Sequence, residues 1–248
     1  MEARIIRIAE TDSTNRWLRD DEPVEDRSLT VCVADYQTAG RGCGTNTWES
    51  ERGENLLFSI RCHPVGLEAK GQFLLSVGMA VVLRDVLRKM LPDEFMVSIK
   101  WPNDIYVDHR KIAGMLIENQ LRGGMVSRSI IGVGLNVNQA EFTSGAPNPV
   151  SMYQLLGRRF DRERMLDEII KRFGAFQSGL HDEDLMQEWF DDYKRSLYRR
   201  TGFYCYRDEQ GEFEAELVGV EPSGRLLLRK KGETSEQAYS FKEVAFVL

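Results

Sequence analysis

The feature that most constrains the fold is residues 96–137, where strand-like runs follow one another with only short turns between them. The runs cover residues 96–101, 105–107, 112–118 and 129–137, and Gly123-Gly124 marks a turn before the last of them. Apolar runs joined by short turns pair with their neighbours in the sequence. We therefore predict an antiparallel or mixed sheet in the middle of the chain.

Helical and strand-like segments surround this region. Residues 4–9 alternate polar and apolar side chains, as a half-buried strand does, and residues 73–90 carry apolar residues at helical spacing until Pro92. Further segments are strands at 30–34 and 55–60, a short helix after the capping residues 11–14, a capping box at 151–154 with Gly157 as the C-cap, and helices at 161–176 and 185–198. The pattern predicts an α+β domain over residues 1–198, with a mixed β-sheet flanked by helices.

The sequence changes in character after Arg200. Five short strand-like pieces fall within the last 48 residues, separated by turn signals at 208–211, 222–224 and 231–232. Short strands with frequent turns are typical of small barrels and sandwiches. We predict a small C-terminal β-barrel over residues 199–248.

Composition excludes several classes of protein. The chain of 248 residues has a formal net charge of -6. Nucleic-acid-binding proteins usually carry a basic surface, so this acidic balance argues against nucleic-acid binding. The basic residues at 194–200 are explained more simply as a solvated helix end. The four cysteines form no Cys-x-x-Cys pair, which argues against a structural zinc site. We find no signal peptide and no membrane-length apolar run, so we expect a cytoplasmic protein with reduced thiols.

A glycine-rich stretch follows the strand at 30–34. It reads Gln37-Thr-Ala-Gly40-Arg41-Gly42-Cys43-Gly44, so backbone N–H groups and a guanidinium are available to a phosphate or carboxylate. The glycine spacing fits neither a P-loop nor a dinucleotide-binding fingerprint. The alternative is a flexible surface loop.

Two lysine-containing motifs lie in the predicted sheet. Lys100-Trp-Pro-Asn103-Asp104 places a cation, an amide and a carboxylate at the end of an apolar strand, where Asp104 would hold Mg²⁺ or orient an amine. Lys111-Ile-Ala-Gly114 begins the neighbouring strand, and Gly114 suggests close approach of a ligand. The alternatives are an ordinary strand end and a solvated hairpin lysine.

Two further motifs are weaker alone. In Gly132-Val-Gly134-Leu-Asn136 two glycines leave one strand face open, and Asn136 offers the donor and acceptor that an adenine edge requires. Asp12-Ser13-Thr14-Asn15 would hydrogen-bond a polar ligand head group. The alternatives are a twisted core strand and simple helix capping. All five motifs would converge on one side of a single sheet.

Together and in this order, the five motifs resemble the biotin protein ligases, also called biotin–[acetyl-CoA-carboxylase] ligases. The resemblance runs as motifs from Asp12 to Asn138, and the C-terminal segment has the placement and length of that family's SH3-like barrel. It implies a catalytic domain shared with lipoate ligases. Because the first motif starts at Asp12, we expect the short form without an N-terminal DNA-binding domain.

The resemblance implies a two-step reaction. ATP and Mg²⁺ would activate biotin to biotinyl-5′-AMP, and a lysine of a biotin carboxyl carrier domain would then accept the biotin. Lys111, Arg41 and Asp104 would be catalytic, and no metal ligands are assigned. Biotin would be bound by Ser13, Thr14, Asn15, Gln37, Gly40, Arg41, Gly42, Cys43, Lys111 and Gly114. ATP would be bound by Arg41, Trp48, Lys100, Asn103, Lys111 and Asn136. The protein would be a monomer or homodimer and would bind neither nucleic acid nor membrane.

The glycine-rich loop departs from the family. Many members carry a second arginine where this chain has Cys43, and basic residues where it has Thr45, Asn46 and Thr47. We therefore expect the loop to hold the intermediate by backbone contacts, and to release biotinyl-AMP faster than an arginine-bearing relative. The alternatives are a lipoate or octanoate ligase or transferase of the same fold, and a non-catalytic biotin or nucleotide sensor. The Lys100–Asp104 motif with the Gly-Arg-Gly loop favours biotin.

Overall fold

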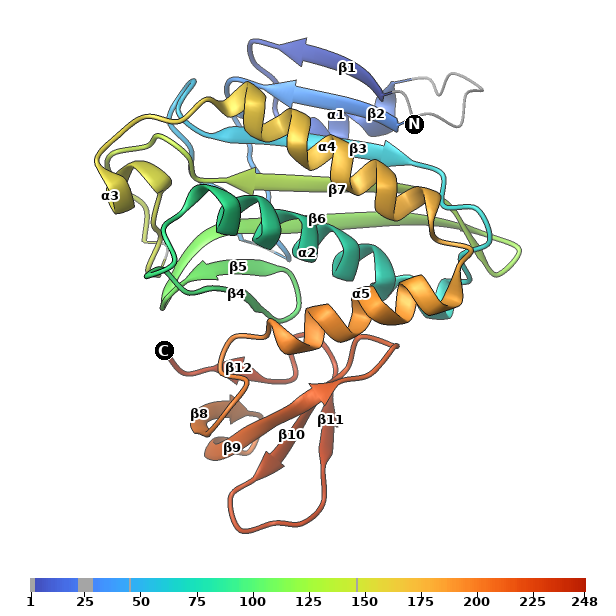
Figure 1. Cartoon of the computed structure of the whole chain (residues 1–248), viewed down its shortest axis with the longest axis vertical. Coiled ribbons are helices and arrows are strands. Elements are labelled where there is room, and N and C mark those ends of the chain that lie inside the picture. Colours follow the sequence, from blue (N-terminus) through green and yellow to red (C-terminus); the bar gives the residue numbers. More distant parts are fainter. Residues whose placement is uncertain (1–2, 22–28, 45, 146) are drawn as a thin grey trace.

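The computed structural model describes residues 3–21, 29–44, 46–145 and 147–248, and these form two sheets (Figure 1). In the described residues the larger sheet has seven strands in the order β1-β2-β3-β7-β6-β5-β4. Their bounds are β1 Ala3–Ile8, β2 Leu29–Ala34, β3 Leu56–Cys62, β4 Val97–Lys100, β5 Asp104–Val107, β6 Arg110–Arg122 and β7 Met125–Leu135. Strands β1 and β2 are parallel and the other pairs are antiparallel, so the predicted mixed sheet is confirmed.

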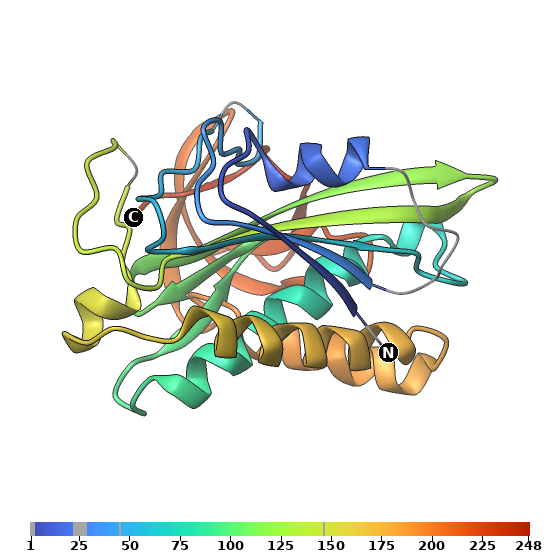
Figure 2. The same ribbon diagram turned by 90° about the horizontal axis from the view of Figure 1, so that it is seen from above.

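Helices cover the two faces of this sheet unequally. The helices are α1 Thr14–Asp20, α2 Phe73–Met90, α3 Met152–Leu156, α4 Arg162–Ser178 and α5 Glu183–Arg195, with a 3-10 turn at Ala69–Gly71. Helices α2, α4 and α5 lie on one side of the sheet and α1 on the other (Figure 2). The main core forms under the three long helices, while the buried cluster under α1 consists, in the part of the chain that the structure describes, of Leu18, Cys32 and Ile130. The thinly covered face is therefore the one with room for a ligand.

Local signals placed most elements correctly. Helix α2 has the predicted bounds, and the capping box forms at Ser151 and Gln154, with Gly157 at φ 65 as the C-cap. Helix α5 begins earlier than predicted because the Asp182 side chain accepts a hydrogen bond from the Leu185 N–H. Strand β7 ends at Leu135, so Asn136 lies beyond the strand on which it was predicted, and its N–H donates to the Ile112 carbonyl.

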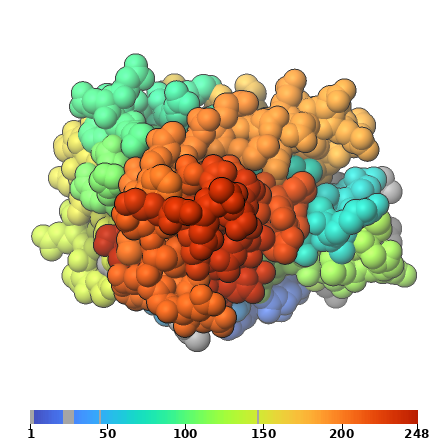
Figure 3. Space-filling model, turned by 90° about the horizontal axis from the view of Figure 1, so that it is seen from below, coloured from blue at the N-terminus to red at the C-terminus, as the bar shows by residue number. Residues whose placement is uncertain are grey.

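The C-terminal segment forms the second, antiparallel sheet, with the predicted five strands in the order β11-β10-β9-β8-β12 within the described residues. The strands are β8 Phe203–Asp208, β9 Gly211–Val220, β10 Leu226–Lys230, β11 Gln237–Tyr239 and β12 Ala245–Phe246. Trp101 joins the two sheets: its Nε1 donates to the Gly224 carbonyl at 2.9 Å, and its ring meets Phe241 edge-on. Seen from below the view of Figure 1, the second sheet covers the centre of the molecule (Figure 3). The domain boundary between residues 198 and 199 stays a prediction.

Membrane insertion by a helix finds no support in the fold. Among the described residues, every helix is too short or too polar to cross a bilayer.

Candidate active site

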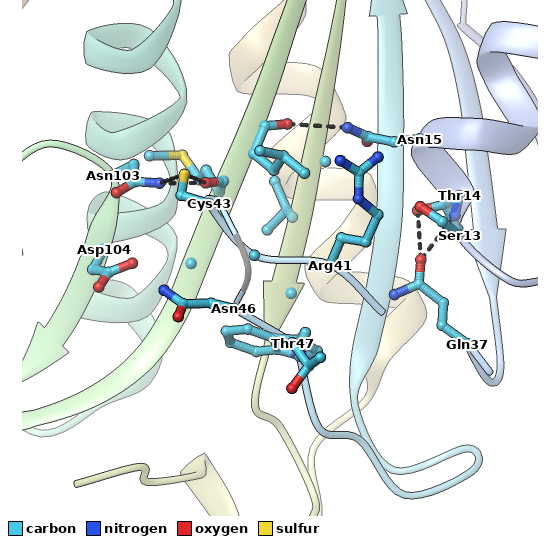
Figure 4. A pocket seen from close by; sticks show the side chains of 18 of the residues that line it. Ser13, Thr14, Asn15, Gln37, Arg41, Cys43, Asn46, Thr47, Asn103 and Asp104 are labelled. Atoms are coloured by element: carbon cyan, nitrogen blue, oxygen red, sulfur yellow. Dashed lines mark hydrogen bonds between the residues drawn. The ribbon is translucent and has the colours of Figure 1, made fainter. Parts of the chain in front are cut away.

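One pocket collects residues from all five motifs (Figure 4). The predicted residues that line it are Ser13, Thr14, Asn15, Gln37, Arg41, Gly42, Cys43, Trp48, Asn103, Asp104, Lys111 and Gly114. They come from α1, from the loop after β2, and from β5 and β6. The sheet register brings them together, since Asp104 on β5 pairs with Gly114 on β6, and Gly114 pairs with Gly134 on β7. The predicted convergence on one side of a sheet is therefore confirmed.

The inner end of the pocket, at Thr14 and Gln37, is polar. Gln37 Oε1 accepts hydrogen bonds from the Thr14 N–H at 2.8 Å and the Thr14 hydroxyl at 3.1 Å. The Ser59 hydroxyl lies 2.7 Å from Thr14 Oγ1 and 2.6 Å from Asn15 Oδ1. Ser13 is the N-cap of α1, but its side chain makes no capping hydrogen bond, so simple capping does not account for this motif.

Ser59 lies behind the pocket and supports two of its lining residues, and sequence reasoning missed it. It is fully buried in β3, where every other residue except Arg61 is apolar. Buried hydroxyls need partners, and here the partners are Thr14 and Asn15. The sequence feature that could have identified Ser59 is a single serine within a predicted apolar strand.

Asn15 is held in place from several sides. Its Nδ2 donates to the Leu116 carbonyl at 3.2 Å and to Glu118 Oε2 at 2.9 Å, and the side chain is almost fully buried. Glu118 also pairs with Arg19 at 2.7 Å and lies 3.7 Å from Arg41 Nη1. The Arg41 side chain is thus directed toward the Asn15 end of the pocket (Figure 4).

The two glycines of β7 make room for two side chains that line the pocket, Asn15 and Trp48. A Cβ at Gly132 would lie 2.3 Å from Asn15 Oδ1, and a Cβ at Gly134 would lie 2.3 Å from Trp48 Cε2. A Cβ at Gly114 would likewise meet Trp48 Cζ3 at 3.1 Å. The Trp48 indole therefore lies against the backbone of two neighbouring strands. The alternative of an ordinary twisted core strand does not explain these contacts.

The opposite end of the pocket is charged. Lys111 Nζ lies 2.7 Å from Asp104 Oδ1 and 5.6 Å from the centre of the Trp48 ring. About a third of the Lys111 side chain is exposed, so its ammonium remains accessible from the pocket. Asp104 is the single carboxylate among the described residues that line this pocket.

The glycine-rich segment forms a turn fastened over the pocket. The Trp48 N–H donates to the Gly40 carbonyl at 2.9 Å, and the Gly42 N–H donates to the Asn46 carbonyl at 2.8 Å. Thr45 lies outside the described residues. Gly40 does not line the pocket, but it must be glycine because a Cβ would lie 2.7 Å from the Trp48 carbonyl oxygen.

Cys43 fastens this turn to the sheet. Asn103 Nδ2 donates to Cys43 Sγ at 3.1 Å and also to the Met115 carbonyl on β6. Burial raises the pKa of the Cys43 thiol, although the Asn103 hydrogen bond opposes the shift. The group is therefore a neutral thiol near pH 7.

Two residues that were predicted to bind ATP, Lys100 and Asn136, lie outside this pocket. Lys100 Nζ lies 5.2 Å from the Tyr106 ring centre and 5.1 Å from that of Phe246, and burial lowers its pKa. Asn136 lines a neighbouring cavity of about 500 Å³, which it shares with Trp48 and Lys111. Its Nδ2 donates to the Val150 carbonyl, and its buried Oδ1 has no hydrogen-bond partner among the described residues. A volume of this size lies within the range of small-molecule sites.

A resident metal site is absent from the described residues, since no three His, Cys, Asp or Glu side chains gather where they could hold an ion.

Comparison with known proteins identifies a family and several similar ligases. Residues 8–136 match the biotin/lipoate A/B protein ligase family. The chain is 41% identical to the bifunctional ligase/repressor BirA of Salmonella typhimurium, over 89% of this chain and 68% of that protein. It is 30% identical to the biotin–[acetyl-CoA-carboxylase] ligase of Paracoccus denitrificans, over 96% of this chain and 99% of that one. The Aquifex aeolicus biotin protein ligase, solved with biotin and ATP, superimposes with a TM-score of 0.79 at 26% identity, covering 98% of this chain and 97% of that one.

Proposed function

Because the chain belongs to the biotin/lipoate A/B protein ligase family, we propose that it is an ATP-dependent biotin protein ligase. The observation that carries the proposal is one continuous pocket with polar, hydrogen-bonding side chains at its Thr14 and Gln37 end and a lysine at its other end. A neutral ureido head and a carboxylate tail match these two ends.

The inner end is proposed to bind the ureido head of biotin. The ureido group has N–H donors and a carbonyl acceptor, and the Ser13, Thr14, Asn15 and Gln37 side chains offer both kinds of partner. A lipoyl or octanoyl group has no ureido donors or acceptor and would place an apolar group against these polar side chains, which is costly. The polar inner end therefore favours biotin over lipoate or octanoate.

The nucleotide is proposed to extend from Lys111 into the neighbouring cavity. Trp48 and Lys111 line both spaces, and the unpaired Asn136 Oδ1 is available to a donor of the adenine. Asn103, which hydrogen-bonds Cys43 of the glycine-rich turn, would contact the nucleotide from the side of that turn. A phosphate contact by Lys100 requires its ammonium to turn away from Tyr106 and Phe246, and its role stays a prediction.

In the first step, an oxygen of the biotin carboxylate attacks the α-phosphorus of ATP. A new P–O bond forms, the bond to the bridging oxygen breaks, and pyrophosphate leaves with that electron pair. Negative charge is shared among the phosphoryl oxygens, and Lys111 is placed to stabilise it. Arg41 would join Lys111 only after leaving Glu118. Mg²⁺ would arrive with the triphosphate and supply positive charge to it, and Asp104 is the one carboxylate that lines the pocket within the described part of the chain.

In the second step, the amine of a carrier lysine attacks the carbonyl carbon of biotinyl-AMP. An amide forms, and AMP leaves as the other product. The ammonium of the carrier lysine must lose a proton to become this nucleophilic amine, and Asp104 is the candidate acceptor once Lys111 is engaged by the ligand. The turn over the pocket would keep water from the intermediate. The partner is proposed to be a biotin carboxyl carrier domain, met in the cytoplasm by a monomer or homodimer of this chain.

Biotin-dependent exchange of radiolabelled pyrophosphate into ATP tests the proposal, with lipoate and octanoate in parallel reactions. Exchange with biotin alone supports the proposed activation step. Exchange with lipoate or octanoate would assign the chain to the other branch of its family. Tight biotin binding without exchange would show a non-catalytic sensor.

A further inference from the structure

The second sheet contributes residues to the mouth of the pocket. Phe241, in the turn between β11 and β12, lines the pocket although its neighbouring strands belong to the other sheet. The next residue, Lys242, lies over the glycine-rich turn: a Cβ on Gly44 would be 2.7 Å from Lys242 Nζ and 3.4 Å from its Cε. The Lys242 ammonium therefore lies beside the residue that follows Cys43.

The backbone at Lys242 has a conformation that is unusual for a lysine. Its φ is 76, in the left-handed region where glycine is favoured and a lysine is strained. Residues held in such conformations cluster at functional sites. The Lys242 ammonium also has no carboxylate within ion-pair distance among the described residues, whereas Lys230 and Lys231 of the same sheet pair with Asp208 and Glu214. No local ion pair thus explains Lys242.

The charge balance of the pocket leaves a role for a further cation. The lining residues include two cations, of which Lys111 is paired with Asp104 at 2.7 Å and Arg41 is directed to Glu118 at 3.7 Å. The turn itself has a thiol at position 43 and uncharged side chains at Asn46 and Thr47. A triphosphate carries several negative charges, and cations positioned on them stabilise both bound ATP and departing pyrophosphate.

We propose that Lys242 binds the β- and γ-phosphates of ATP. The glycine-rich turn has no positive charge at position 43, and Lys242 of the second sheet would supply that charge instead. The direction of the nucleotide supports this assignment. With the adenosine in the cavity of Trp48 and Asn136 and the α-phosphate at Lys111, terminal phosphates that extend into the first pocket would reach Asn103 and Cys43, which line it, next to Gly44 and the Lys242 ammonium. The inference rests on the proposed function, and it makes the second sheet part of the nucleotide site.

The consequence for the reaction is electrostatic. When the bond from the α-phosphorus to the bridging oxygen breaks, the electron pair stays on pyrophosphate, and the Lys242 ammonium stabilises that charge without transferring a proton. Lys242 would act on ATP and pyrophosphate but not on biotin or AMP. This difference separates a phosphate-binding lysine from one that only supports the turn.

The test compares ATP and AMP binding to the full-length chain by calorimetry, for wild type and Lys242→Met. Methionine keeps most of the aliphatic stem and removes the charge. We expect ATP affinity to fall about tenfold, the size of one charged hydrogen bond, with AMP and biotin affinities unchanged. The matched control is Lys231→Met, on the same sheet and paired with Glu214 away from the pocket, which should bind ATP as wild type does.

Two further variants guard against a folding artefact. Lys242→Gly relieves the left-handed backbone, so it should lose ATP affinity without losing thermal stability. Cys43→Arg in the Lys242→Met background should restore ATP affinity, because it returns a charge to the same place. Unchanged ATP affinity in Lys242→Met, or equal losses for ATP and AMP, would overturn the inference. A wild type that binds ATP but shows no biotin-dependent exchange would instead overturn the proposed function.

Discussion

Gly132→Ala is the change with the most specific expected effect on the proposed biotin site. The added Cβ would lie 2.3 Å from Asn15 Oδ1, and this distance must grow to at least the 3.4 Å of ordinary contact. Asn15 cannot move freely, because Ser59, Glu118 and the Leu116 carbonyl all hydrogen-bond its amide. Either these bonds stretch or strand β7 shifts.

The magnitude follows from overpacking of a buried site. Inserting a methyl group into such a place costs roughly 1–3 kcal/mol of the free energy of unfolding. For a chain of this size the melting temperature should fall by about 4–8 °C per 2 kcal/mol. Displacing Asn15 should also remove one or two hydrogen bonds to the ureido head, which weakens biotin binding by roughly 10- to 100-fold.

The assays are thermal unfolding and calorimetric titration with biotin. Gly219→Ala is the matched control, because Gly219 also lies in a strand but a Cβ there would meet no atom within 4 Å. Gly134→Ala is the second comparison: its Cβ meets Trp48, so it should impair use of ATP more than binding of biotin. Biotin affinity within twofold of wild type and an unchanged melting temperature for Gly132→Ala would refute this account of the pocket.

Three further predictions concern the charged end and the turn. Lys111→Ala should slow biotin-dependent pyrophosphate exchange by about 10²–10³-fold, as loss of one donor to a developing oxyanion does; a loss below tenfold would show that Lys111 has another role. Cys43→Arg should slow the release of free biotinyl-AMP, measured as biotin on bystander proteins, and an unchanged release rate would show that position 43 does not retain the intermediate. Because burial raises the pKa of the Cys43 thiol, the thiolate fraction at pH 7–9 is smaller than for a free cysteine. Iodoacetamide should therefore label Cys43 slowly near neutral pH and faster as pH rises, as followed by peptide mass spectrometry; labelling at the rate of a free thiol at pH 7 would contradict its burial.

The sequence by itself determined most of the elements and the order of the motifs. Helix Phe73–Met90, the capping box at Ser151 and the five short C-terminal strands follow from periodicity, caps and turns. These signals are local, since each depends on residues a few positions apart. The resemblance carried by the ordered motifs also identified the family that the comparisons show.

The tertiary structure alone decided which side chains meet. Asn15 contacts Glu118, and Ser59 contacts Thr14, across separations that only the strand order β2-β3-β7-β6 brings together. The same strand order brings Arg41 near Glu118, and packing of the second sheet places Phe246 beside Lys100. Lys242 showed no motif in the sequence, and packing of the second sheet against Trp101 places it over Gly44. Burial of the apolar core that runs through both sheets fixes how the sheets pack, and no local pattern encodes the contacts between residues that are distant in the chain.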